Sequence, residues 1–224
     1  MASVPRSVPP RRRWLRAILL TVLAGAAFGL MLAIGVWTRA CAGGACPSIA
    51  GLTNYDPDQA SKVYAADGRL ITDFGLQRRT VVALEQTSPA VPAAFLAVED
   101  KRFYEHNGVD WIRVGGALKS VFTGQRLQGF STITMQLAGN LWPESINRRE
   151  RTLQRKVREI KVAYEIERTY SKDKILELYL NQIDLGNRAF GVEAAAQRYF
   201  GKLVRDLTVA EAAMLAAMPK APTR

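Results

Sequence analysis

The feature that most constrains this chain is an uncharged apolar run near its N-terminus. The run extends over 21 residues, from Ala17 to Trp37, close to the ~20 residues that a helix needs to cross a bilayer. Arg39 alone follows it closely, whereas five basic residues precede it: Arg6, Arg11, Arg12, Arg13 and Arg16. The positive-inside rule therefore predicts a transmembrane helix with its N-terminus in the cytoplasm and the rest of the chain outside. The alternative is a cleaved signal peptide, whose apolar core typically has only ~7–15 residues.

The composition allows one folded domain beside this helix. Of the 224 residues, 48% are apolar and 23% charged, enough for a hydrophobic core. The net charge of +11 predicts an anionic partner: nucleic acid, an acidic membrane surface or a phosphate-bearing substrate. A location outside the cytoplasm argues against nucleic acid. We predict a basic cytoplasmic tail, a transmembrane helix, a linker and a folded domain, at 1–16, 17–37, 38–62 and 63–224.

Local patterns predict a mainly α domain that begins with a small β element. The stretch KVYAADGRLITDFG reads as two strands around Asp67-Gly68, a type I′ hairpin signal. Helices are expected from Pro92 onward, and four segments have helical periodicity or capping signals: 110–124, 153–168, 171–183 and 208–218. Cys41 and Cys46 are expected to form either a disulfide without a catalytic role or two free thiols.

Three polar stretches are candidates for chemistry. Glu99 follows the apolar stretch AAFLAV, so its carboxylate is expected in a partly dry region that suits a general base, unless it ends a solvated helix. The stretch GFSTITMQ groups hydroxyl and amide side chains that could bind phosphate or sugar oxygens, unless it is a Thr-rich strand or a helix N-terminus. A row of charges, Arg151, Arg155, Lys156 and Glu159, could hold a diphosphate, unless it forms ordinary surface ion pairs.

These stretches together resemble the peptidoglycan glycosyltransferase family, found in monofunctional transglycosylases and in the N-terminal domain of class A penicillin-binding proteins. EDKRFYEHNG fits the motif EDxxFxxHxG, GFSTITMQ fits GxSTxTxQ, and RKVRE fits RKxxE. The similarity extends from about Val63 to the last residue. Relatives continue beyond the closing motif MLAAMPKAP, so the domain is expected to be truncated at its C-terminus.

The resemblance implies a lysozyme-like, two-lobed fold in which one lobe is partly embedded in the membrane. Such enzymes polymerise lipid II into β-1,4 glycan strands, with inversion at MurNAc C1 and release of undecaprenyl diphosphate. Carried over by motif, the catalytic residues would be Glu99, as general base, and Glu159, which assists departure of the diphosphate. Ser131, Thr132, Gln136, Arg151, Arg155 and Lys156 would bind substrate. Four residues would shape the first motif: Asp100, Phe103, His106 and Gly108.

The resemblance also implies partners and a location. We expect lipid II, the growing glycan strand and membrane lipid as partners, together with a penicillin-binding transpeptidase domain or protein, at the inner membrane with the catalytic domain periplasmic or extracellular. A divalent cation, Mg²⁺ or Mn²⁺, could assist at Glu159, and no organic cofactor is expected. Gly139 stands where the family often has a phosphate-binding cation, a duty that Arg148 or Arg151 could take over. The alternatives are a non-catalytic module that binds lipid II or partners, and a lysozyme-like muramidase.

Overall fold

The computed structural model describes residues 10–50, 52, 57, 59, 61–74, 78–124, 129–147, 150 and 152–220. The chain divides into two compact units, Met1–Ala45 and Cys46–Arg224. The first contains helix α1 (Pro10–Arg39) and the short helix η1 (Ala42–Gly44). By length and composition, Arg13–Arg39 could cross a membrane. The helix extends beyond the predicted 17–37 because basic and aromatic residues also adopt helical structure. Arg6 lies outside the described residues.

The predicted hairpin is present at the start of the second unit. Strands β1 (Ser61–Tyr64) and β2 (Leu70–Phe74) pair antiparallel, with Ser61 opposite Phe74. The predicted turn type is wrong, because a type I′ turn needs positive φ at both central residues. Here Gly68 has φ 82° and Asp67 does not have positive φ.

Both cysteines, Cys41 and Cys46, are disulfide-bonded, which answers the question that the sequence left open.

A second, two-stranded pairing was not predicted. Strand β3 (Arg78–Arg79) pairs in parallel with β4 (Ala189–Phe190). The extended segment that follows β3 is held by Asn181, whose side chain accepts from the Val82 amide at 3.0 Å and donates to the Val82 carbonyl at 2.8 Å. These contacts fasten the start of the unit to its later helices.

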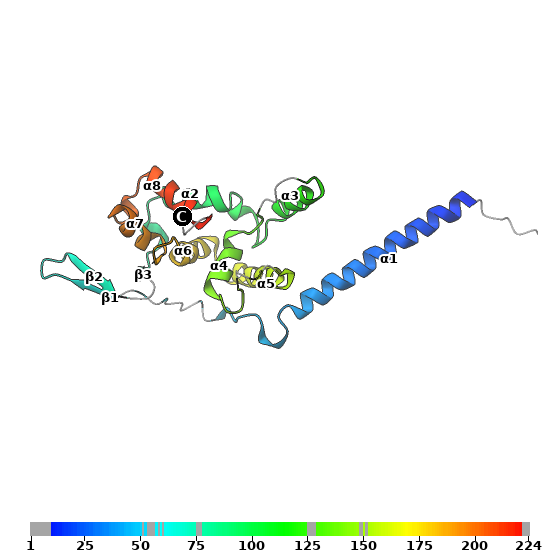
Figure 1. Ribbon diagram of the computed structural model, residues 1–224, viewed down its shortest axis with the longest axis horizontal. Coiled ribbons are helices and arrows are strands. Elements are labelled where there is room, and N and C mark those ends of the chain that lie inside the picture. Colours follow the sequence, from blue (N-terminus) through cyan, green and yellow to red (C-terminus); the bar gives the residue numbers. More distant parts are fainter. Residues whose placement is uncertain are drawn as a thin grey trace, which may run out of the picture. The chain divides into compact units, whose positions relative to one another are not determined.

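Seven α-helices are the main secondary structure of the described part of this unit, and they confirm the mainly α prediction (Figure 1). They are α2 (Ala90–Glu99), α3 (Trp111–Phe122), α4 (Ile133–Leu141), α5 (Leu153–Thr169), α6 (Lys172–Gln182), α7 (Val192–Phe200) and α8 (Val209–Ala217). Short 3₁₀ helices connect or follow them: η3 (Leu84–Gln86), η4 (Phe103–Glu105), η5 (Val204–Asp206) and η6 (Met218–Lys220).

Side-chain caps fix where several of these helices begin. Asp110, Ser171 and Thr208 cap α3, α6 and α8, and each is the first residue of a segment in which periodicity or capping signals predicted a helix. At α8 the cap is reciprocal, because Glu211 accepts hydrogen bonds from the backbone amide and hydroxyl of Thr208. Hydrogen bonds from Lys202 and then from Thr208 lower the pKa of Glu211 to about 2.

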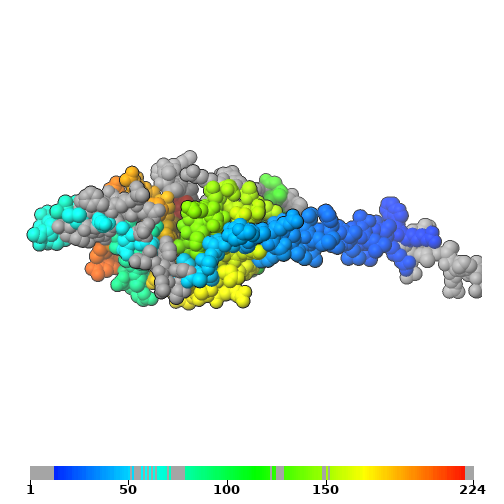
Figure 2. All heavy atoms as spheres, turned by 90° about the horizontal axis from the view of Figure 1, so that it is seen from below, coloured from blue at the N-terminus to red at the C-terminus, as the bar shows by residue number. Residues whose placement is uncertain are grey.

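The buried apolar residues form two clusters, and α4 contributes to both. The larger cluster includes Phe95 and Tyr179, which make an edge-to-face contact at 6.1 Å, and Leu137 of α4. The smaller consists of Val109, Met135 of α4 and Ala163 of α5, with partly buried residues around them. Helices α4 and α5 lie side by side (Figures 1 and 2). Helix α4 therefore connects the two clusters.

Helix α3 exposes the apolar stripe that predicted it. Ala117 and Ser120 are buried, whereas large apolar side chains on the rest of the helix are more than half exposed: Trp111, Ile112, Leu118 and Val121. The apolar spacing of Trp111, Val114, Leu118 and Val121 correctly predicted the helix, but Trp111, Leu118 and Val121 face outward. This leaves an apolar surface, which we call the α3 face and define by these four exposed residues.

Candidate active site

Glu99 is the last residue of α2 and is held from α4. Val91 and Phe95 are fully buried on the same helix, which fixes α2 against the core. The Glu99 Oε2 atom accepts a hydrogen bond from Gln136 Nε2 at 2.7 Å. Its other oxygen, Oε1, is buried and has no hydrogen-bond partner among the described residues. A carboxylate oxygen in a dry place without a donor is suited to accept a proton from a substrate hydroxyl.

The neighbouring Asp100 points into the protein instead. It is 1% exposed, and both carboxylate oxygens lie 3.1 Å from His106 Nε2. One of them also accepts the backbone N–H of Ile133 at 3.0 Å. Because Ile133 is the first residue of α4, Asp100 ties the end of α2 to the start of α4. The adjacent carboxylates thus face different environments.

The loop that contains His106 is fastened by a lysine that the sequence did not single out. Lys172 Nζ donates to the His106 carbonyl at 2.5 Å and pairs with Glu167 at 2.8 Å. The same ammonium lies 4.3 Å from the ring centroid of Phe103, which is fully buried. Since His106 also contacts Asp100, the single histidine of the chain connects the loop to that buried carboxylate.

Gly108 allows the loop to pass close to α5. Its φ is +86°, and a Cβ atom there would lie 3.2 Å from the backbone carbonyl group of Ala163. The Thr132 hydroxyl donates to the Gly108 carbonyl at 2.6 Å and accepts the Met135 amide as the N-cap of α4. Thr132 is fully buried, so the structure gives it a role in holding the loop, and its predicted role in substrate binding stays a prediction.

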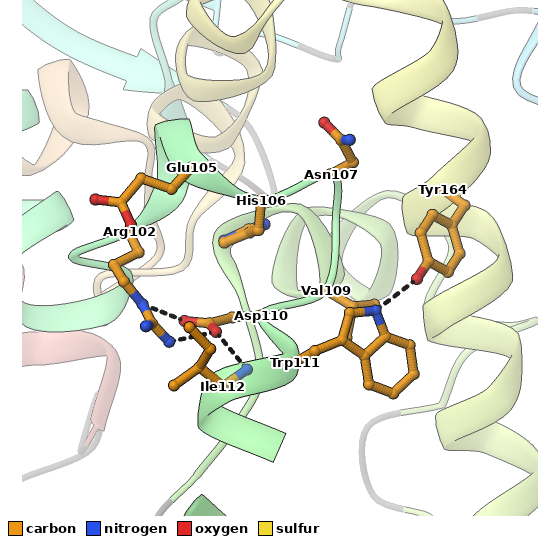
Figure 3. A pocket seen from close by; sticks show the side chains of 9 residues that line it. All are labelled: Arg102, Glu105, His106, Asn107, Val109, Asp110, Trp111, Ile112 and Tyr164. Carbon is orange, nitrogen blue, oxygen red and sulfur yellow. Dashed lines mark hydrogen bonds and ion pairs between the residues drawn. The ribbon is translucent and has the colours of Figure 1, made fainter. Parts of the chain in front are cut away.

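A pocket of about 340 Å³ lies beside this loop, with His106 in its wall (Figure 3). Arg102 forms two contacts with the Asp110 carboxylate, and Trp111 Nε1 donates to the Tyr164 hydroxyl at 3.1 Å. Burial alone would raise the pKa of Asp110, but hydrogen bonds from Arg102 and from the backbone of Arg113 and Ile112 lower it below its usual value. An ionised Asp110 therefore fixes the start of α3.

The charged row on α5 is a compact cluster with one buried carboxylate. Glu159 is 5% exposed and pairs with Arg155 and with Lys156, whose Nζ is 2.9 Å away. Lys156 Nζ also donates to Ser131 Oγ at 2.7 Å and lies 4.6 Å from the ring centroid of Phe130. The structure thus brings Ser131 and Lys156 together. Arg148 and Arg151 lie outside the described residues, and Gly139 is buried in α4.

The two candidate carboxylates are linked through one short segment. Gln136 binds Glu99, and Ser131 binds the lysine that pairs with Glu159. Glu99 also lines a pocket of about 350 Å³ together with Asp110 and three basic residues: Lys101, Arg102 and Arg113. A carboxylate among cations, joined through α4 to a second cationic cluster, is suited to a reaction that moves a proton while anionic charge develops nearby.

Comparison with known proteins matches the sequence to a family. The sequence profile described as transglycosylase matches residues 67–224, more than half of the chain. The chain belongs to the transglycosylase family. It is 51% identical over 174 residues to penicillin-binding protein 1A of Aquifex aeolicus, covering 77% of this chain and 23% of that protein. It is 48% identical over 178 residues to penicillin-binding protein 1A of Escherichia coli, covering 79% and 20%.

A solved structure of penicillin-binding protein 1A from Haemophilus influenzae also matches this chain. The identity is 30%, the match covers 75% of this chain and 15% of that chain, and the TM-score is 0.37. The chain thus spans about a quarter or less of the length of these relatives. Family membership confirms the resemblance that the three motifs indicated.

Sequence reasoning missed several residues that shape the candidate site. Arg113, Lys172 and Glu167 each contact a motif from a distant part of the chain, and Thr134 donates to Glu167 at 2.5 Å. Lys172 is the first residue of α6 and directly follows the N-cap Ser171. The sequence around it therefore indicates the start of a helix and does not indicate its contacts with the loop. No local signal in the sequence distinguishes Arg113 from other basic residues of the helices.

The residues around Glu159 do not fit a divalent cation held by the protein alone. Such ions take several oxygen ligands, whereas the described neighbours that pair with Glu159 are the cations Arg155 and Lys156. Within the described ranges there is no group of three or more His, Cys, Asp or Glu side chains that could hold a metal. The predicted Mg²⁺ or Mn²⁺ stays a prediction, and its oxygens would have to come largely from a substrate.

Proposed function

We propose that this transglycosylase polymerises lipid II and that Glu99 is its general base. The GlcNAc 4-hydroxyl of one lipid II molecule attacks MurNAc C1 of the growing chain while its proton passes to Glu99. The bond from C1 to the diphosphate oxygen breaks, with inversion, and undecaprenyl diphosphate leaves with that electron pair. The observation that carries this proposal is the buried, unpartnered Oε1 of a carboxylate held by Gln136.

Glu159 holds two cations, Arg155 and Lys156, that would stabilise the negative charge of the leaving diphosphate. Arg155 and Lys156 are fixed beside Glu159 on a helix, and guanidinium and ammonium groups bind phosphate oxygens through charge-assisted hydrogen bonds. Ser131, bound to Lys156, would contact the same diphosphate. A muramidase acting on finished glycan would have no diphosphate for these groups to bind, so the cationic cluster favours polymerisation.

The apolar surfaces support a reaction at the membrane. We propose that α1 anchors the chain in the inner membrane with its N-terminus in the cytoplasm, which follows from the basic residues that precede it. The α3 face would contact the bilayer that holds lipid II, because exposed apolar patches mark interaction surfaces.

A penicillin-binding transpeptidase, in the same polypeptide or a separate one, would cross-link the product.

Polymerisation of labelled lipid II tests this proposal directly. The full chain in detergent or vesicles, with and without Mg²⁺, would be incubated with labelled lipid II and the products resolved on a gel. A ladder of glycan strands is expected. Release of soluble fragments from finished glycan would support the muramidase, and lipid II binding without product would support a non-catalytic module.

Lys156→Met is expected to weaken lipid II binding about 10-fold or more, since a charge-assisted hydrogen bond contributes about 1.5–3 kcal/mol. Equilibrium binding of fluorescent lipid II measures the change. The matched control is Arg168→Met, which removes an exposed cation from the same helix. Equal losses in the two variants would mean that general electrostatic attraction, not a site at Lys156, binds the diphosphate.

A label on the α3 face is expected to enter the bilayer. Because both native cysteines are disulfide-bonded, an environment-sensitive thiol dye would label only an added cysteine. In vesicles, dye at Ile112→Cys should shift to shorter wavelength and be quenched by brominated acyl chains. Dye at Val209→Cys, an equally exposed apolar position on α8, should do neither, since the two residues are 73% and 75% exposed. Identical spectra would contradict membrane contact by α3.

A further inference from the structure

Arg113 joins two segments that precede or contain active-site residues. Its Nη1 donates to the Glu99 carbonyl at 2.8 Å, and its Nη2 donates to the Gly129 carbonyl at 2.9 Å. The same Nη1 lies 3.7 Å from Asp100 Oδ1. One guanidinium in the first turn of α3 therefore bridges the end of α2 and the residue two positions before Ser131.

The Glu99 carbonyl needs such a partner because of its place in the helix. The last four carbonyls of an α-helix have no intrahelical donor, and the helix dipole favours a cation at this end. Arg113 supplies both a donor and a positive charge. The planar guanidinium can also bind two acceptors at once in a fixed geometry, which an ammonium group cannot do.

Arg113 is itself held in place. Its backbone N–H donates to Asp110 Oδ1 at 3.1 Å, and Asp110 is paired with Arg102. The side chain is 32% exposed and lines the same pocket as Glu99. The bridge is thus anchored by the cap of α3 at one end and by two backbone carbonyls at the other.

We propose that Arg113 is a positioning residue for the general base. Gln136 fixes the Glu99 carboxylate, and Arg113 fixes the backbone from which that side chain extends, relative to the segment that leads to Ser131. Loss of Arg113 lets the end of α2 and Gly129 move apart, so the base meets the substrate hydroxyl less often in a reactive geometry. The inference rests on the proposed function of Glu99.

Steady-state kinetics of the full chain with lipid II tests the proposal. Arg113→Ala is expected to lower kcat about 10- to 100-fold, since small displacements of catalytic groups have effects of this size, with a much smaller change in KM. Arg113→Lys should recover only part of kcat, because it cannot bridge both carbonyls. Added guanidinium ion should restore part of the activity of Arg113→Ala, and none in Glu99→Gln. Lys119→Ala, which removes an exposed cation from α3, is the control and should match the wild type.

The possible results separate this inference from the proposed function. If the wild type makes no glycan, the proposed function fails. If the wild type is active and Arg113→Ala keeps its kcat, or loses only lipid II affinity, Arg113 is not a positioning residue. If Arg113→Ala unfolds, the activity of Arg113→Lys tests the inference instead. Full activity in Arg113→Lys would show that a guanidinium bridging both carbonyls is not needed.

Discussion

Glu99→Gln is expected to reduce polymerisation of lipid II about 10²- to 10⁴-fold, the range that general-base catalysis contributes. The amide has the shape of the carboxylate and can still accept the hydrogen bond from Gln136, so the end of α2 keeps its geometry. It cannot take the proton of the attacking hydroxyl. Lipid II binding should therefore persist while the rate of glycan formation falls, as measured by gel analysis beside equilibrium binding.

The matched control is Glu85→Gln, which removes an exposed carboxylate from η3. This variant should polymerise at the wild-type rate. A Glu99→Gln protein that makes glycan strands at a comparable rate would show that another group takes the proton. A variant that fails to bind lipid II would instead place Glu99 in substrate recognition.

Much of the fold could be predicted because it depends on local signals. The uncharged run predicted α1, and polar caps at Asp110, Ser171 and Thr208 marked helix starts that the structure confirms. The hairpin was also predicted, although its turn has positive φ at Gly68 and not at Asp67. The pairing of β3 with β4 was not, because two-residue strands have no periodicity and their partners are far apart in the sequence.

Periodicity also could not say what covers a helix. The apolar spacing of α3 predicted a helix correctly, yet Leu118 and Val121 are exposed while Ser120 is buried. A pattern of apolar residues shows that one face differs from another. Whether the apolar face meets a protein core or an acyl chain depends on neighbours that the sequence does not reveal.

The candidate site shows the same division between local and tertiary information. Family motifs identified Glu99 and Glu159, but the contacts that distinguish their surroundings come from other helices. Gln136 reaches Glu99 from α4, and Lys172 reaches the His106 carbonyl from α6. Such contacts join residues whose separation in the sequence follows no simple period. The same holds for Arg113, whose two carbonyl partners, Glu99 and Gly129, lie on either side of α3 in the sequence.

Asp100→Ala is expected to destabilise the protein by about 3 kcal/mol or more, although it stands next to the base. The change removes a buried carboxylate and leaves the Ile133 amide and the His106 ring nitrogen without a partner. Each kcal/mol lowers Tm by about 2–4 °C in a chain of this size, so the melting temperature should fall by roughly 6–12 °C. Thermal unfolding of purified protein measures the shift.

Two further variants separate loss of charge from loss of the hydrogen bonds. Asp100→Asn keeps an oxygen for the Ile133 amide and should lose less stability than Asp100→Ala. Glu105→Ala, which removes an exposed carboxylate from the same loop, should keep the wild-type Tm. Unchanged Tm in Asp100→Ala would contradict a structural role for Asp100. If instead Asp100→Ala melts early and Glu99→Gln keeps its Tm but makes no glycan, two adjacent acids serve separate purposes, because one faces α4 and a histidine while the other keeps an oxygen free for substrate.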